Sequence, residues 1–128
     1  MRLLLDTHIW LWFLADLERL PPHVLAAIEG ADDVRLSAVC IWETVIKVGA
    51  GKLVLPMPAT ELVAVSHRDA GMQPLAVDAR HALAVRELPD HHRDPFDRLL
   101  VAQARVEGLT LVTADAKVQA YDVPVLGV

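Results

Sequence analysis

The chain has 128 residues, of which 54% are hydrophobic, so it is long enough to bury a core as one domain and too apolar to stay disordered. Its formal net charge of -5 argues against broad, non-specific binding to nucleic acid, although a carboxylate cluster that binds cations would itself contribute negative charge. The single cysteine, Cys40, excludes an internal disulfide and a cysteine-based zinc site and is typical of a reducing cytosol.

The first predicted strand and helix meet at an acidic residue. Residues 2–5 are apolar without alternation, which predicts a strand buried on both faces, as in a parallel sheet. Asp6 suits the N-cap of a helix over residues 7–14, but it also lies at the carboxyl end of the strand, where open α/β folds bind ligands. Asp6 and His8 interrupt the apolar start, no cleavage site follows, and no run reaches the roughly 18 residues of a membrane helix. We therefore expect a cytoplasmic protein with no membrane segment.

The middle of the chain alternates helices with short strands. The expected elements are a helix opened by Pro21-Pro22 and ended by Gly30, a turn at 32–33, a strand at 34–36, a helix at 38–48, a helix at 59–70, a strand at 74–77 and a helix at 79–88. Residues 52–58 read as an irregular connection. His81 is expected to be a surface residue and not a ligand.

Glu43 lies in the middle of the helix at 38–48. This helix is apolar on nearly every side, which predicts that it is buried. A buried carboxylate is costly unless something compensates it. An ion pair with Lys47, four residues further on, explains Glu43 without any function, but such a pair contributes only about 0.2–0.5 kcal/mol. A functional role for Glu43 therefore stays open beside the ion pair.

The stretch from residue 91 to residue 108 begins with a polar loop and continues as a helix. The adjacent histidines His91 and His92 are expected to have structural or solvent-facing roles, because adjacent residues rarely bind the same ion. Asp94 reads as the N-cap, and Asp97 is at the third helical position, where an acid completes a capping box. Asp94 and Arg98 are four residues apart and so lie on the same face of the helix, whereas Asp97 lies on the face that carries apolar residues. Asp97 is therefore the better candidate for chemistry, and Asp94 for the cap.

The end of the chain carries one more acid at a strand end. Residues 109–112 read as a strand, and Asp115 follows at its carboxyl end, where it suits the N-cap of a short helix at 116–120. Residues 123–126 make a fifth strand. Strands separated by helices predict an α/β fold with a five-stranded parallel sheet flanked by helices, in one domain over residues 1–128.

Four acids at separate points of the chain are thus candidates for one site: Asp6, Glu43, Asp97 and Asp115. Each has a cap or an ion pair as its simpler explanation. Together they are expected to gather at one edge of the sheet, where their mutual repulsion requires cations. Oxygen ligands select hard ions such as Mg²⁺ or Mn²⁺, and phosphodiester hydrolysis is the chemistry that such a site supports.

Four segments of the chain resemble the PIN-domain ribonucleases, specifically VapC-type toxins of toxin–antitoxin pairs. The matching segments, in family order, are LLLDTHIWLW, SAVCIWETVIKVGAGKL, DPFDRLLVAQA and TLVTAD. The resemblance implies a PIN domain over 1–128 that forms a homodimer, cleaves RNA in single strands or structured loops, and is inhibited by a cognate VapB-type antitoxin. It implies that the four acids hold Mg²⁺ or Mn²⁺ and that the Thr113 hydroxyl supports them. Lys47 and Arg98 are candidates for phosphate contacts.

Two other classes of protein remain open at this point. A phospho-accepting receiver domain is also a small α/β protein, but it carries an acid pair after its first strand, which Asp6-Thr7-His8 does not supply. A catalytically silent interaction module of the PIN fold would keep a dimer and a groove without metal-dependent cleavage. An Asp-x-Asp phosphatase is excluded because position 8 is histidine.

Overall fold

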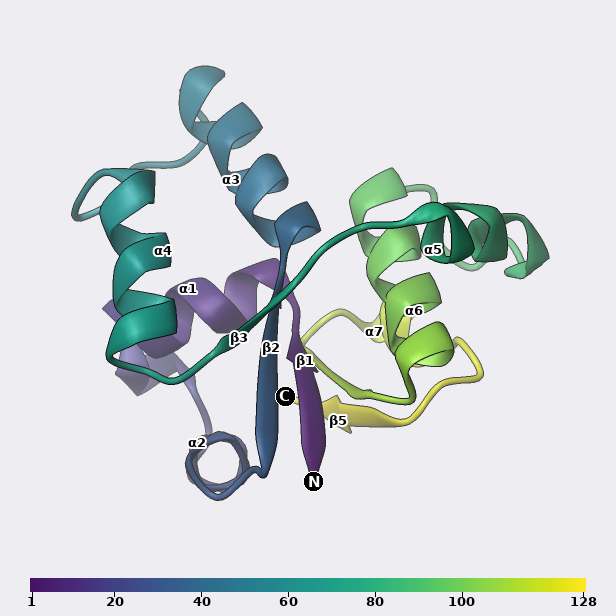
Figure 1. Cartoon of the computed structure of the whole chain (residues 1–128), viewed down its shortest axis with the longest axis horizontal. Coiled ribbons are helices and arrows are strands. Elements are labelled where there is room, and N and C mark those ends of the chain that lie inside the picture. The colour runs from purple at the N-terminus through teal and green to yellow at the C-terminus, as the bar shows by residue number, and fades with distance from the viewer.

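The computed structural model describes residues 1–128 and contains a five-stranded, wholly parallel sheet (Figure 1). Its strands are β1 (Arg2–Leu5), β2 (Asp33–Ser37), β3 (Gln73–Leu75), β4 (Thr110–Thr113) and β5 (Val125–Gly127), in the spatial order β3-β2-β1-β4-β5. The predicted α/β fold is thereby confirmed. The expected turn at 32–33 is wrong for Asp33, which pairs with Arg2 as the first residue of β2.

Seven α-helices connect and cover the strands. They are α1 (Thr7–Ala15), α2 (Pro22–Glu29), α3 (Ala38–Gly49), α4 (Ala59–Arg68), α5 (Ala79–Ala84), α6 (Pro95–Glu107) and α7 (Ala116–Gln119), with 3-10 turns at Leu17–Arg19 and Val85–Glu87. In Figure 1, α1, α2 and α4 lie on one side of the central strands and α5 and α6 on the other, while α3 extends beyond the carboxyl end of β2. None of these helices combines the length and the apolar character needed to cross a membrane.

The core is centred on β1 and β4, two of the three strands that have neighbours on both sides. Leu3, Leu4 and Leu5 of β1 and Leu111 and Val112 of β4 expose no surface. Helices cover both faces of these strands, which explains why their sequences show no polar alternation. Because all five strands are parallel, their carboxyl ends lie at one edge of the sheet, and the residues that follow them meet there.

Helix α3 differs from the prediction that it is buried on nearly every side. Its inner face is buried, but the outer face exposes large apolar side chains: Trp42 (59% exposed), Val45 (52%), Ile46 (43%) and Val48 (41%). The inner face packs against α1, α4 and α6. The outer face is only partly covered: Trp42 packs edge-on against Phe96, and Val45 and Val48 line an apolar hollow with residues from the segment 53–59. An apolar face left open in this way is typical of a surface that binds another molecule.

His81 is buried, so the prediction that it lies on the surface is wrong. Its Nδ1 accepts a hydrogen bond from the Asp78 N–H at 3.0 Å, and its Nε2 lies 2.9 Å from Oε1 of Glu107. The ring thus completes the capping box of α5 and fastens that helix to α6. Sequence reasoning missed this because Glu107 is 26 residues away.

Candidate active site

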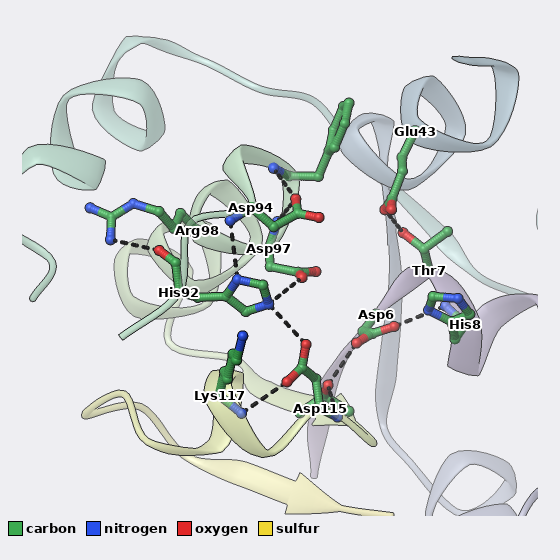
Figure 2. A network of polar contacts seen from close by, with 12 residues as sticks. Asp6, Thr7, His8, Glu43, His92, Asp94, Asp97, Arg98, Asp115 and Lys117 are labelled. Atoms are coloured by element: carbon green, nitrogen blue, oxygen red, sulfur yellow. Dashed lines mark hydrogen bonds and ion pairs between the residues drawn. The ribbon is translucent and has the colours of Figure 1, made fainter. Parts of the chain in front are cut away.

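The four predicted acids line one pocket of about 370 Å³ at the carboxyl edge of the sheet (Figure 2). Asp6 follows β1, Asp115 lies two residues beyond β4, Glu43 is in the middle of α3, and Asp97 is in the first turn of α6. The other residues that line the pocket are His8, Trp12, Lys47, His92, Asp94 and Ala114. The fold therefore brings together acids that are separated by up to 109 positions in the sequence (115 − 6).

Hydrogen bonds to strand β4 and to the first turn of helix α1 fix Asp6 in this pocket. Its backbone N–H donates to the Val112 carbonyl at 3.0 Å and so continues the pairing of β1 with β4. Its Oδ1 accepts from the His8 N–H at 2.8 Å as the N-cap of α1, and its Oδ2 accepts from the Thr113 hydroxyl at 2.6 Å. The Thr113 hydroxyl also accepts from the Asp115 N–H at 3.1 Å. Thr113 thus connects two of the four acids, and the cap leaves Asp6 facing the pocket.

Glu43 is almost fully buried, with 3% of its surface exposed. Its Oε1 accepts a hydrogen bond from the Thr7 hydroxyl, and its Oε2 accepts one from the Lys47 ammonium, both at 2.6 Å. The hydrogen bond with Glu43 raises the pKa of Lys47, so the ammonium stays charged. Lys47 also lines the pocket.

Asp97 is an acid of the pocket whose ionisation is opposed by its surroundings. Burial, together with the negative charges of Asp94, Asp6 and Glu43, raises the pKa of Asp97 to about 7. Burial also raises the pKa of Asp6, despite the hydrogen bond from Thr113. Carboxyl groups held together at such a cost are typical of functional sites, because a cation would remove the repulsion.

The cap of α6 forms differently from the predicted capping box. Asp94 Oδ1 accepts from the N–H groups of Phe96 (2.8 Å) and Asp97 (3.2 Å), as expected of an N-cap. The Asp94 N–H, however, donates to Nδ1 of His92 at 3.1 Å and not to the side chain of Asp97. The Asp97 carboxylate is therefore free of the capping role that would have explained it.

Substitutions of Asp94 separate its capping role from any role in the pocket. Asp94→Ala removes the acceptor of two N–H groups and is expected to lower the free energy of unfolding by about 1 kcal/mol, whereas Asp94→Asn should cost less because Asn caps almost as well. Urea unfolding of both variants measures the difference. An Asp94→Asn variant with unchanged stability that no longer bound divalent metal would place Asp94 among the metal ligands instead.

His92 is the pocket residue that sequence reasoning missed. Its Nε2 lies 2.9 Å from Oδ2 of Asp115 and 3.0 Å from Oδ2 of Asp97, between the two carboxylates (Figure 2). Burial opposes ionisation of Asp115, but the hydrogen bonds from His92 and from the Lys117 N–H outweigh it and lower the pKa of Asp115. The signal in the sequence was the pair of adjacent histidines beside Asp90, which by itself favoured a structural or solvent-facing role.

Arg98 does not face the pocket, so the structure does not support it as a phosphate contact. Its Nη1 donates to the Pro89 carbonyl at 3.0 Å and to the Tyr121 hydroxyl at 3.1 Å, and its Nη2 donates to the Val85 carbonyl at 3.2 Å. The guanidinium is thus used to order the loop before α6. Its predicted pairing with Asp94 is replaced by these contacts.

The donors of the pocket fit Mg²⁺ or Mn²⁺. Four carboxylates supply oxygen atoms, which hard divalent cations prefer, and the pocket contains no thiolate for zinc. Lys47 forms an ion pair with Glu43, and the imidazole Nε2 of His92 lies close to Asp97 and Asp115. The residues present therefore fit a divalent cation on physical grounds.

Comparison with known proteins identifies the family of the chain. The family described as the PIN domain matches residues 3–124. The chain belongs to the PIN domain family. Ribonuclease VapC22 of Mycobacterium tuberculosis is 30% identical to this PIN domain over 124 residues, which are 94% of this chain and 92% of VapC22. The family predicted from the four sequence segments is thereby confirmed.

Solved structures share the fold of this PIN domain at low sequence identity. VapBC2 from Rickettsia felis, bound to a DNA fragment from its promoter, matches with a TM-score of 0.71 at 15% identity over 99% of this chain and 98% of that chain. FitAcB from Neisseria gonorrhoeae matches with a TM-score of 0.65 at 24% identity over 98% and 96% of the two chains. The alternative of a receiver domain is therefore excluded.

Proposed function

We propose that this PIN domain is a metal-dependent endoribonuclease that acts as the toxin of a VapBC-type toxin–antitoxin pair. The observation that carries the proposal is the convergence of Asp6, Glu43, Asp97 and Asp115 in one pocket, with the pKa of Asp97 raised to about 7. The chain is similar along nearly its whole length to a protein named ribonuclease VapC22, and this similarity supports RNA hydrolysis as the reaction.

The four acids would hold the Mg²⁺ or Mn²⁺, and a bound ion would supply an activated water and stabilise the leaving oxygen of the phosphodiester. The other residues of the pocket have supporting roles. Thr7 and Thr113 orient Glu43 and Asp6 through hydrogen bonds of 2.6 Å. Lys47 neutralises part of the charge of Glu43 and is placed to meet a phosphate oxygen of RNA.

The open apolar face of α3 supports a protein partner for the chain. Trp42, Val45, Ile46 and Val48 expose more apolar surface than a solvated helix face needs. We assign it to the homodimer contact or to a cognate VapB-type antitoxin, in line with the VapBC and FitAcB assemblies that share the fold. A cytoplasmic location, where RNA and antitoxin are both available, completes the proposal.

The decisive test is cleavage of a mixed RNA pool by the purified, antitoxin-free protein. Cleavage is expected with Mg²⁺ or Mn²⁺, and it should be lost with EDTA and in Asp6→Asn. Asp69→Asn, which changes an exposed carboxylate at the end of α4, is the matched control and should cleave like the wild type. Cleavage that persisted in EDTA or in Asp6→Asn would contradict the assignment. A folded protein that cleaved no RNA and bound no divalent metal would favour the silent interaction module, whereas metal binding without cleavage would point to a very selective RNA target.

A further inference from the structure

We propose that His92 is a positioning residue of the metal centre, which holds Asp97 and Asp115 together without binding the metal itself. The inference rests on the proposed function of the pocket. Asp97 belongs to α6, and Asp115 is the N-cap of α7, so the two acids come from separate elements. The imidazole Nε2 lies between them, 3.0 Å from Asp97 and 2.9 Å from Asp115.

The second ring nitrogen of His92 decides which form of the imidazole is present. Nδ1 faces the backbone N–H of Asp94 at 3.1 Å and accepts its hydrogen bond. A nitrogen that accepts carries no proton, so the proton of the neutral ring is on Nε2. The nitrogen between the two carboxylates is therefore a donor. Its one proton forms the hydrogen bond to Asp115, and Oδ2 of Asp97 lies 3.0 Å from the same nitrogen as a close polar contact.

This tautomer is the opposite of the one that a metal ligand needs. A histidine that binds a metal does so through an unprotonated nitrogen and donates its other N–H to an acceptor. Here the other nitrogen meets a backbone N–H, which cannot accept. His92, Asp97 and Asp115 lie close enough to resemble a three-residue metal site, but only the two carboxylates have lone pairs to offer.

The backbone of His92 is itself fixed by contacts from distant parts of the chain. Its N–H donates to the Tyr121 hydroxyl at 3.0 Å, and Arg98 Nη1 reaches both that hydroxyl (3.1 Å) and the His92 carbonyl (3.4 Å). The side chain of His92 is only 13% exposed. The loop before α6 has no regular structure, so these contacts supply the rigidity that positions the imidazole. Arg98 thus acts on the site through His92.

The consequence of this arrangement is preorganisation of two like charges. Without a donor between them, Asp97 and Asp115 would repel one another and turn outward to water. Each carboxylate oxygen has two lone pairs, so the contacts with His92 leave acceptor capacity toward the pocket. Removal of a partner that orients ligands typically weakens metal affinity about 10- to 100-fold.

A matched set of substitutions at position 92 tests this role through metal binding. His92→Gln keeps an N–H donor at nearly the reach of Nε2, whereas His92→Asn keeps an acceptor for the Asp94 N–H but does not reach the carboxylates. Calorimetric titration of the full-length protein should show that His92→Asn and His92→Ala weaken Mg²⁺ and Mn²⁺ by the same factor, about 10- to 100-fold. His92→Gln should bind within about threefold of the wild type, and Asp69→Asn, the exposed control at the end of α4, should bind as the wild type does.

Three results would overturn the proposal. The first is wild-type affinity in both His92→Asn and His92→Ala. The second is a loss for Mn²⁺ much greater than for Mg²⁺, or ¹⁴N coupling from a coordinated imidazole in pulsed EPR of the Mn²⁺ protein, since either makes His92 a ligand. The third is a wild-type protein that binds neither ion, which overturns the proposed function as well. Thermal unfolding in EDTA verifies that the variants are folded. If His92→Ala is unfolded, the metal affinities of His92→Gln and His92→Asn are compared instead.

Discussion

Asp97→Asn is expected to abolish RNA cleavage and, at the same time, to make the metal-free protein more stable at pH 8. Cleavage should fall at least about 100-fold, because the variant loses a metal ligand and the charge that holds the cation. Stability should rise because the carboxylate is partly buried near Asp6, Glu43 and Asp94, which raises its pKa to about 7. The amide of Asn has nearly the same shape and carries no charge.

The size and sign of the stability change follow from the raised pKa of Asp97. The folded state holds a proton on Asp97 up to about pH 7, whereas an unfolded aspartate loses it near pH 3.9, so stability falls as the pH rises between these values. A difference of three pKa units corresponds to at most about 4 kcal/mol at pH 8, and the gain in Asp97→Asn should be a fraction of this.

Urea unfolding at pH 8 in EDTA, compared with Asp69→Asn, measures the stability change. The same experiment separates two explanations of Asp97. An acid that served α6 as part of a capping box would lose stability on substitution, whereas an acid kept for a cation should gain it. An Asp97→Asn protein that cleaved RNA at the wild-type rate would remove Asp97 from the site. An Asp97→Asn protein that was less stable than the wild type at pH 8 would show that Asp97 serves the N-terminal cap of α6.

The sequence predicts the sheet and two of the acids well because they depend on local patterns. Leu3 to Leu5 and Leu111 to Val112 are uninterrupted apolar runs, and such runs occur where a strand is covered on both faces. Once the strands are parallel, the residues that follow β1 and β4 must lie at one edge, and these are Asp6 and Asp115. The helical period likewise placed the side chain of Asp97 on the apolar side of its helix, toward the interior of the protein.

His92 and Arg98 lie beyond such reasoning because their partners are set by tertiary structure. His92 is in an irregular loop, where no period fixes the direction of a side chain, and its partners Asp115 and Tyr121 are 23 and 29 residues away. Arg98 was expected beside Asp94 from helical spacing, but it finds five backbone carbonyl and hydroxyl acceptors on the neighbouring loop and chain end. These contacts depend on how α6 packs against the rest of the chain.

Helix α3 shows a different limit of sequence reasoning. A helix that is apolar on nearly every side is expected to be buried, and the pattern is the same whether its own chain or another molecule covers it. The exposed Trp42 and Val45 show that this chain covers the other side only in part. The hydrophobic pattern therefore does not distinguish a helix that its own chain covers from one that leaves an apolar face open.

Divalent metal is expected to bind this protein about ten-fold more tightly at pH 8 than at pH 6. A carboxyl group must lose its proton before it can bind a cation, so metal affinity depends on the fraction of Asp97 that is ionised. With a pKa of about 7, that fraction is roughly 10% at pH 6 and 90% at pH 8. Asp6, whose pKa is also raised, acts in the same direction, whereas Asp115 does not, because its pKa is lowered.

Calorimetric titration of Mg²⁺ at pH 6, 7 and 8, in buffers of different ionisation enthalpy, measures both the affinity and the protons released. About one proton should be released per ion at pH 6, and few at pH 8. Asp97→Asn should bind more weakly at every pH and lose most of this dependence, whereas Asp69→Asn should keep it. An affinity that did not change with pH in the wild type would mean that Asp97 is already ionised at pH 6.

The same proton links metal binding to the stability of the fold. Between pH 6 and pH 8 the metal-free protein should become less stable, since the charge on Asp97 develops beside Asp6, Glu43 and Asp94. The cation neutralises that charge, so the rise in melting temperature on adding Mg²⁺ at a fixed concentration should be larger at pH 8 than at pH 6. A pocket whose acids were only caps and surface pairs would show no such trend, because carboxylates of ordinary or lowered pKa are already ionised at pH 6. Mg²⁺ would then leave the melting temperature unchanged at either pH.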